Sequence, residues 1–183
     1  DWSSDVCSSD LLADNQDLLA KGPEVWWPWW LSQFMQFSGL MPHPDAVQAL
    51  VDNQGLWRAP LPGALEGVAA VMAAGYKVGI VSNADGTVEQ DLNAAGVGDF
   101  FDVVIDSTVV AVAKPDPDIF TFALDALGVE PDDTWYVGDS PLFDGGGAAA
   151  AGLAEFVLVD PIGLHEYQPR IGRIDELPGL LKA

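Results

Sequence analysis

The sequence has 183 residues and is strongly acidic, with 28 Asp and Glu against 7 Lys and Arg and a formal net charge of -21. Its hydrophobic content of 49% and its seven tryptophans exclude an intrinsically disordered chain, and its length suits one domain with a small insert. So negative a surface repels nucleic acid and anionic membranes, and we expect neither as a partner. No apolar run in the sequence is long enough to span a bilayer.

Residues 1–11 differ from the rest of the chain, because they show neither helical nor strand periodicity. They match the codon-by-codon translation of a common short-read sequencing adapter, so we interpret them as an adapter-derived artefact. A genuine serine-rich tail is the alternative. The single cysteine, Cys7, falls in this segment, so we expect no disulfide or thiol chemistry elsewhere. The chain does not begin with Met, and we expect its natural beginning to be missing; a cytoplasmic location is expected.

Residues 12–58 have a helical pattern and are expected to form a small all-helical module. We predict helices over residues 12–19, 26–37 and 44–56, with Pro28 in the first turn of the second helix. Aromatic side chains are expected to make most of the core of this module, with one or two lining a cleft: Trp26, Trp27, Trp29, Trp30, Phe34 and Phe37.

From residue 59 to residue 183, apolar strands alternate with helices. The predicted strands cover 78–81, 101–105, 135–137 and 156–159, and the predicted helices cover 61–74, 88–95, 117–127, 144–151 and a last segment from about Asp175. Regular alternation of this kind is typical of a parallel sheet that is covered by helices on both faces. The predicted fold class is therefore α/β, with a Rossmann-like core after the helical module.

Two of the predicted strands lead into polar residues suited to bind an anion. Ser82 and Asn83 follow the strand over 78–81, where a hydroxyl and backbone amides can form an anion site. A helix N-cap is the alternative role for Ser82. Lys114 stands in a later strand-end loop, where a cation indicates pairing with a phosphate or with carboxylates. A solvated loop lysine is the alternative.

Two aspartates follow the third predicted strand. Asp139 comes directly after the apolar run, and Asp144 follows five residues later. Open α/β sheets keep their ligand crevices at the carboxyl ends of the strands, and paired carboxylates there suit Mg2+. Acidic residues favoured at a helix start are the alternative, which accounts for Asp144 better than for Asp139.

Taken together, these motifs resemble those of the haloacid dehalogenase-like (HAD) hydrolase superfamily. Ser82 matches the Ser or Thr of its second motif, Lys114-Pro115 matches its third, and Gly138-Asp139-Ser140 with Asp144 matches its fourth. The resemblance covers roughly residue 61 to the end of the chain, and the helical module stands where the superfamily inserts its helical cap.

The resemblance implies a Mg2+-dependent phosphatase that acts on a small phosphorylated metabolite. Ser82 and the backbone amide of Asn83 would bind the phosphoryl group, and Lys114 would neutralise its charge. Asp139 would hold Mg2+ directly, with Asp144 assisting. Phosphoryl transfer of this kind needs mainly positioning and charge neutralisation.

One departure from the superfamily is large. Its first motif, an apolar strand that ends in Asp-x-Asp and supplies the nucleophile and the general acid, is not found before the helical module. We therefore expect a core without its first, central strand, a slot in the middle of the sheet, and a chain that folds poorly and is inactive by itself.

Three other functions remain open. A 2-haloacid dehalogenase-type hydrolase would not need the metal pair. A dinucleotide-binding protein is suggested by the glycines at 145–147 but disfavoured by Ala150 and by the nearby carboxylates. A non-catalytic Rossmann-like binding module is the third possibility, and the oligomeric state is left open.

Overall fold

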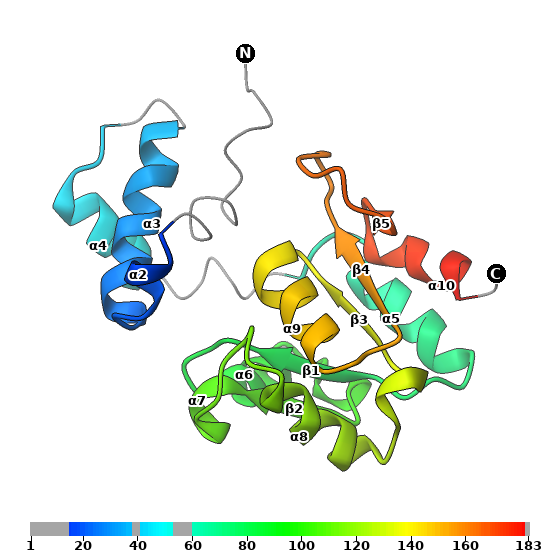
Figure 1. The fold of residues 1–183 in the computed structure, drawn as a ribbon. Helices are drawn as coiled ribbons and strands as arrows, with labels where there is room; N and C mark the ends of the chain where they lie inside the picture. Colours follow the sequence, from blue (N-terminus) through cyan, green and yellow to red (C-terminus); the bar gives the residue numbers. More distant parts are fainter. Residues whose placement is uncertain (1–14, 38–40, 53–59, 182–183) are drawn as a thin grey trace. The chain divides into compact units, whose positions relative to one another are not determined.

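The computed structural model describes residues 15–37, 41–52 and 60–181 (Figure 1). The chain divides into two compact units, residues 1–59 and residues 60–183. The adapter interpretation concerns residues 1–11, which lie outside the described residues, and it stays a prediction.

The first unit is helical, as the sequence pattern indicates. It contains α2 (Gln16–Leu19), α3 (Pro23–Phe37) and α4 (Pro44–Asp52). Its buried core joins α3 to α4 and consists of Leu31, Met35 and Val47. Trp27 and Trp30 pack against this core and stack on each other, with ring centroids 5.1 Å apart. The side chains of Phe34 and Phe37 lie outside the described part, as do residues 12–14 and 53–56 of the predicted helices.

The position of Pro28 in this unit differs from the prediction. Helix α3 begins at Pro23, so Pro28 lies inside the helix and not in its first turn. Pro23 suits the first helical position because the N–H that it lacks would have no partner there. Pro28 does cost the helix one backbone hydrogen bond, and the hydroxyl of Ser32 donates to the Pro28 carbonyl at 2.8 Å.

The second unit has the predicted α/β alternation, and all of its strand pairs are parallel. The strands are β1 (Gly79–Ser82), β2 (Val103–Asp106), β3 (Trp135–Gly138), β4 (Glu155–Val159) and β5 (Arg170–Ile171). The α-helices are α5 (Ala64–Ala73), α6 (Val88–Ala94), α7 (Ser107–Val110), α8 (Asp118–Leu127), α9 (Gly146–Ala150) and α10 (Leu177–Leu180). Short 3-10 turns cover Gly98–Phe100, Pro131–Asp133 and Ile174–Glu176, and a π-turn covers Pro141–Gly145.

The strands form two separate sheets. One has the order β1-β2 and the other the order β3-β4-β5, and no strand pairing in the described part of the unit joins β1 to β3. Within each sheet the register is regular, with Val81 opposite Ile105 and Val137 opposite Val157. The expected interruption of the sheet therefore lies between β1 and β3.

Helices cover both faces of the strands, as Figure 1 shows for α8 and α9 on one side and α5 and α10 on the other. The larger core cluster includes Val81, Phe120, Ala148, Phe156 and Leu158, so it holds the two sheets together through side chains. The alternate residues of β4 face the other way and form a second cluster with Ile171 and the helices near the C-terminus. Packing, not a continuous hydrogen-bond ladder, unites the two sheets.

One helix and one strand were missed by the sequence prediction. Helix α7 follows β2 directly, because the carboxylate of Asp106 accepts a hydrogen bond from the Thr108 amide at 2.9 Å and caps the helix. Strand β5 has only two residues, too few to show a periodic pattern. None of the described helices is long and apolar enough to cross a membrane.

Candidate active site

The carboxyl ends of β1 and β3 meet at the loop that carries Lys114. Asn83, the first residue after β1, exchanges two hydrogen bonds with the backbone of Lys114: the Lys114 amide donates to Asn83 Oδ1 at 2.7 Å, and Asn83 Nδ2 donates to the Lys114 carbonyl at 2.9 Å. The side chain of Asn83 thus fixes the lysine loop against the end of β1.

The ammonium group of Lys114 reaches across to the other sheet. Its Nζ atom donates to Asp144 Oδ1 at 2.6 Å and to the hydroxyl of Tyr136 at 2.9 Å. The ion pair is buried, with 11% of the Lys114 side chain and 4% of the Asp144 side chain exposed. An ammonium has three donors, so one stays available after these two bonds.

Lys114 keeps its charge at neutral pH. Burial alone would lower the pKa of Lys114, but the neighbouring Tyr136 and Asp144 outweigh it and raise the pKa above its ordinary value. The solvated-lysine alternative does not describe this side chain. Lys114 is a fixed cation that faces carboxylates.

Asp144 is held by the loop that follows β3 as well as by Lys114. Its Oδ2 atom accepts hydrogen bonds from the amides of Asp139 at 3.0 Å and Ser140 at 2.9 Å. Gly138 permits this arrangement, because a Cβ atom there would lie 2.4 Å from Asp144 Oδ2. Gly138, the last residue of β3, is therefore required by the close approach of the Asp144 carboxylate to the backbone.

Asp139 is the exposed member of the pair. Partial desolvation, together with the charge of Asp144, raises the pKa of Asp139 above its ordinary value. A divalent cation would remove this repulsion, so the donor set fits Mg2+, which commonly binds one or two carboxylates and completes its shell with water and phosphate oxygens. No cluster of three or more His, Cys, Asp or Glu side chains suited to a metal occurs among the residues described.

Ser82 ends β1 on the other side of the site and is half-buried. Helix α6 begins at Val88 with Thr87 at its N-cap, so Ser82 does not cap that helix. Its hydroxyl has no hydrogen bond within the described ranges and can donate to a ligand. Asn83 is exposed beside it, with its side chain engaged by Lys114.

Tyr136 is a site residue that the sequence analysis missed. It lies in β3, and its hydroxyl donates to the Val81 carbonyl of β1 at 2.8 Å while it accepts the bond from Lys114. A polar-tipped aromatic residue inside the apolar run before Gly-Asp was the available signal. The pattern alone does not show that this tip points to the lysine.

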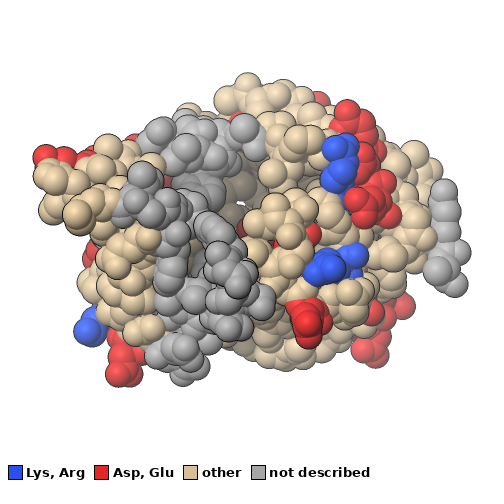
Figure 2. All heavy atoms as spheres, turned by 90° about the horizontal axis from the view of Figure 1, so that it is seen from above, with Lys and Arg blue, Asp and Glu red and all other residues tan. Residues whose placement is uncertain are grey.

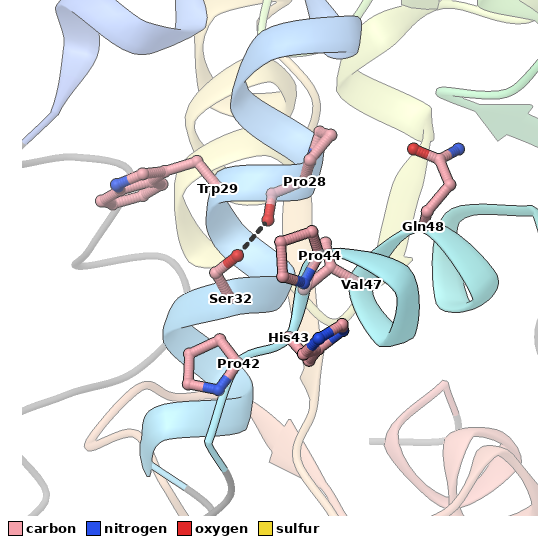
Figure 3. A pocket seen from close by; sticks show the side chains of 8 residues that line it. All are labelled: Pro28, Trp29, Ser32, Pro42, His43, Pro44, Val47 and Gln48. Atoms are coloured by element: carbon pink, nitrogen blue, oxygen red, sulfur yellow. Dashed lines mark hydrogen bonds between the residues drawn. The ribbon is translucent and has the colours of Figure 1, made fainter.

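A separate hollow of about 360 Å³ lies in the helical unit, between α3 and α4 (Figure 3). Prolines, Trp29, Ser32, His43, Val47 and Gln48 line it. None of its lining residues is a carboxylate, a lysine or an arginine. The hollow therefore lacks the charged groups that mark the site at Lys114.

Comparison with known proteins agrees with the motifs. The sequence model of a haloacid dehalogenase-like hydrolase family matches residues 2–152. The human haloacid dehalogenase-like hydrolase domain-containing protein 3 is 31% identical over 141 residues, covering 73% of this chain and 56% of that protein. A phosphoglycolate phosphatase of Nitrosospira multiformis is 36% identical over 106 residues, covering 57% of this chain and 45% of that protein.

A solved structure supports the same relationship. The HAD phosphatase from Thermococcus onnurineus superposes with a TM-score of 0.64 at 28% identity, covering 82% of this chain and 69% of that chain. The chain spans about half the length of the curated relatives it matches. With the family match across residues 2–152, the chain belongs to the haloacid dehalogenase-like hydrolases.

Proposed function

We propose that this chain carries the phosphate-binding and metal-binding part of a Mg2+-dependent phosphatase that acts on a small phosphorylated metabolite. One observation carries the proposal: the Lys114 ammonium is fixed between Asp144 and Tyr136, at the ends of β1, which carries Ser82, and β3, which Asp139 follows. Phosphatases among the relatives support the same class of substrate.

The residues present account for recognition of a phosphoryl group. The free hydroxyl of Ser82 and the backbone amide of Asn83 would donate to phosphoryl oxygens from the β1 side. The remaining donor of Lys114 would face the same oxygens and neutralise part of their charge. Preorganised donors of this kind stabilise the charge that spreads over the equatorial oxygens during in-line transfer.

The carboxylates account for the cation. Asp139 would bind Mg2+ directly, and Asp144 would assist from its anchored position in the loop. When bound, the ion would supply positive charge that neutralises part of the charge of the phosphoryl group and of these aspartates. Few basic side chains are available to compete with Mg2+ for carboxylates. In Figure 2, the few Lys and Arg side chains on the visible face form separate patches beside acidic ones.

The nucleophile of the superfamily has no counterpart in this sequence, since no apolar strand ending in Asp-x-Asp precedes the helical unit. We therefore expect the 183-residue chain to bind phosphate together with Mg2+ but not to turn over a phosphate ester. Residues 12–58 would act as the helical cap of the site.

The test measures binding and turnover separately. Inorganic phosphate and Mg2+ together should raise the melting temperature of the chain, and p-nitrophenyl phosphate should not be hydrolysed. The variants Lys114→Met and Asp139→Asn should each lose the ligand-induced rise. A control variant, Asp116→Asn, alters an exposed carboxylate that accepts from the Asp118 amide and should keep it.

Three results would contradict the proposal. A rise that survives removal of Mg2+ by a chelator would favour a metal-independent hydrolase of the 2-haloacid dehalogenase type. If neither Lys114→Met nor Asp139→Asn changes the ligand-induced rise in melting temperature, phosphate binds at another place than this site. Hydrolysis of p-nitrophenyl phosphate by the purified chain would show that it contains a nucleophile that we have not identified.

A further inference from the structure

The hydroxyl of Tyr136 stands at the division between the two sheets. It donates to the Val81 carbonyl of β1 at 2.8 Å and accepts from Lys114 Nζ at 2.9 Å. A phenolic hydroxyl has one proton to donate and lone pairs to accept with, so both bonds form together. One atom of β3 thus contacts an edge of β1 and the cation of the site.

The bond to Val81 replaces a missing strand contact. Backbone groups point to alternate sides along a strand, and both the amide and the carbonyl of Val78 bond to Asp102, at the side of β2. Val81 therefore directs its carbonyl away from β2, towards β3. Within the described residues no backbone hydrogen bond spans this division, and the Tyr136 hydroxyl satisfies the Val81 carbonyl in place of a neighbouring strand.

The ring of Tyr136 is held rigidly, so its hydroxyl has a fixed position. Phe120 of α8 packs edge-on against the ring at a centroid distance of 4.9 Å, and Phe156 of β4 stacks on it at 6.4 Å. Burial, the largest cause, raises the pKa of Tyr136 to about 12, so the hydroxyl keeps its proton at neutral pH. The bond to Val81 is then present whenever the chain is folded.

We propose that Tyr136 is a positioning residue that sets where the Lys114 ammonium lies between the Ser82 side and the Asp139 side of the site. Asp144 alone would hold the ammonium by one bond, about which the long lysine side chain can still swing. The second bond, to a hydroxyl anchored on β1, fixes the direction of the third donor. The consequence for phosphate binding rests on the proposed function, whereas the placement of Lys114 does not.

The experiment compares two tyrosines of one aromatic cluster. Tyr136→Phe removes only the hydroxyl and leaves the ring that packs on Phe120 and Phe156. Tyr167→Phe is the matched control, because Tyr167 also packs against Phe156, at 5.3 Å, and its hydroxyl has no bond within the described ranges. Both variants and the unchanged chain are labelled with 15N at lysine, and the Lys114 signal is assigned by its loss in Lys114→Met.

A buried, doubly hydrogen-bonded ammonium exchanges its protons slowly and gives a sharp 15N–1H signal. We expect this signal for Lys114 in the unchanged chain and in Tyr167→Phe, and its loss or broadening in Tyr136→Phe. Calorimetric titration of inorganic phosphate with Mg2+ should show an affinity about tenfold weaker in Tyr136→Phe, as expected for one hydrogen bond to a charged group. Tyr167→Phe should bind as the unchanged chain does.

The outcomes separate this inference from the proposed function. A Lys114 signal unchanged in Tyr136→Phe would overturn the positioning role, whatever the chain binds. A signal lost in that variant, in a chain that binds no phosphate, would overturn the proposed function and support the positioning role. If Tyr136→Phe does not fold, 3-fluorotyrosine at position 136 keeps the ring and changes the hydroxyl acidity. The Lys114 signal should then shift, and its failure to shift would overturn the inference.

Discussion

The two sheets of the α/β unit each end in a buried aspartate that serves the fold. Asp106 ends β2, is 5% exposed, and accepts from the amides of Gly86 and Thr108, each at 2.9 Å. Asp160 follows β4, is 7% exposed, and accepts from three consecutive amides at residues 163–165. In both, each of the two carboxylate oxygens accepts from backbone amides, and Asp160 Oδ2 also lies 3.5 Å from Arg170 Nη1, so these acids shape loops.

The line where the two sheets meet is different. Asp144 is as buried as the other two, at 3% exposed, but only its Oδ2 atom accepts from backbone amides, and its Oδ1 atom accepts from the Lys114 ammonium. Asp139 beside it is exposed and carries a raised pKa. An aspartate at a strand end thus has a structural role where backbone amides bond to both of its oxygens. It is suited to bind a ligand where its negative charge is not balanced by neighbouring groups. The following substitutions test this distinction.

The largest effect is expected for Asp144→Ala. It leaves the Lys114 ammonium buried without its anion and the amides of Asp139 and Ser140 without an acceptor. Removing one partner of a buried ion pair costs about 3–5 kcal/mol, and urea unfolding at pH 7 measures it. Asp116→Ala, which removes an exposed acceptor of the Asp118 amide, should cost about 1 kcal/mol. Equal losses of unfolding free energy in the two variants would refute the prediction that the buried ion pair makes Asp144 the more important carboxylate.

Asp160→Asn tests a saturated carboxylate away from the division. An amide side chain offers one acceptor oxygen in place of two, so the variant should lose about 1–3 kcal/mol of unfolding free energy at pH 7. Burial raises the pKa of Asp160, but the amides of His165, Leu164 and Gly163 outweigh this and hold the pKa below its ordinary value.

The pH dependence of that loss has a definite sign. A depressed folded pKa stabilises the fold above the unfolded pKa of the group, and this contribution is lost as the pH falls through the folded pKa. The difference between the unchanged chain and Asp160→Asn should therefore shrink on acidification below about pH 4. A difference that grows on acidification would contradict the assignment.

Gly147→Ala tests the packing that joins the two sheets. A Cβ atom there would lie 2.7 Å from Phe120 Cε2 and 3.2 Å from the Pro115 carbonyl, so overpacking should cost about 1–3 kcal/mol. Gly146, next to it in α9, has its nearest such neighbour at 3.9 Å. Gly146→Ala should be neutral or stabilising by up to about 1 kcal/mol in the same thermal unfolding assay.

The smallest effect is expected for Asp139→Asn. Removing the exposed charge beside Asp144 relieves repulsion, so without divalent cations the variant should be more stable, by less than about 1 kcal/mol because solvent screens the pair. Added Mg2+ should raise the melting temperature of the unchanged chain and leave the melting temperature of Asp139→Asn unchanged. Asp133→Asn changes another exposed acid and should keep the rise in melting temperature with Mg2+. An equal rise in Asp139→Asn would show that Asp139 does not bind the metal ion.

Much of the fold follows from local patterns. Apolar runs of three to five residues, separated by helical stretches, predicted β1 to β4 and the parallel arrangement. The boundaries differ from the prediction where side-chain capping decides them, as at Asp106, whose carboxylate caps α7 directly after β2. The start of α3 was also predicted wrongly. The aromatic pattern begins at residue 26, whereas the helix begins at Pro23, so Pro28 lies inside it.

By itself, the sequence determined the residue types of the site and their order at strand ends: Ser82, Asn83, Lys114, Asp139 and Asp144. Strand ends can be read from it because hydrophobic periodicity is a local property of the chain. Only the tertiary structure decided what each of them contacts, since burial and hydrogen-bond partners come from distant segments. It brought Tyr136 within reach of Lys114 and Val81, and it separated buried Asp144 from exposed Asp139.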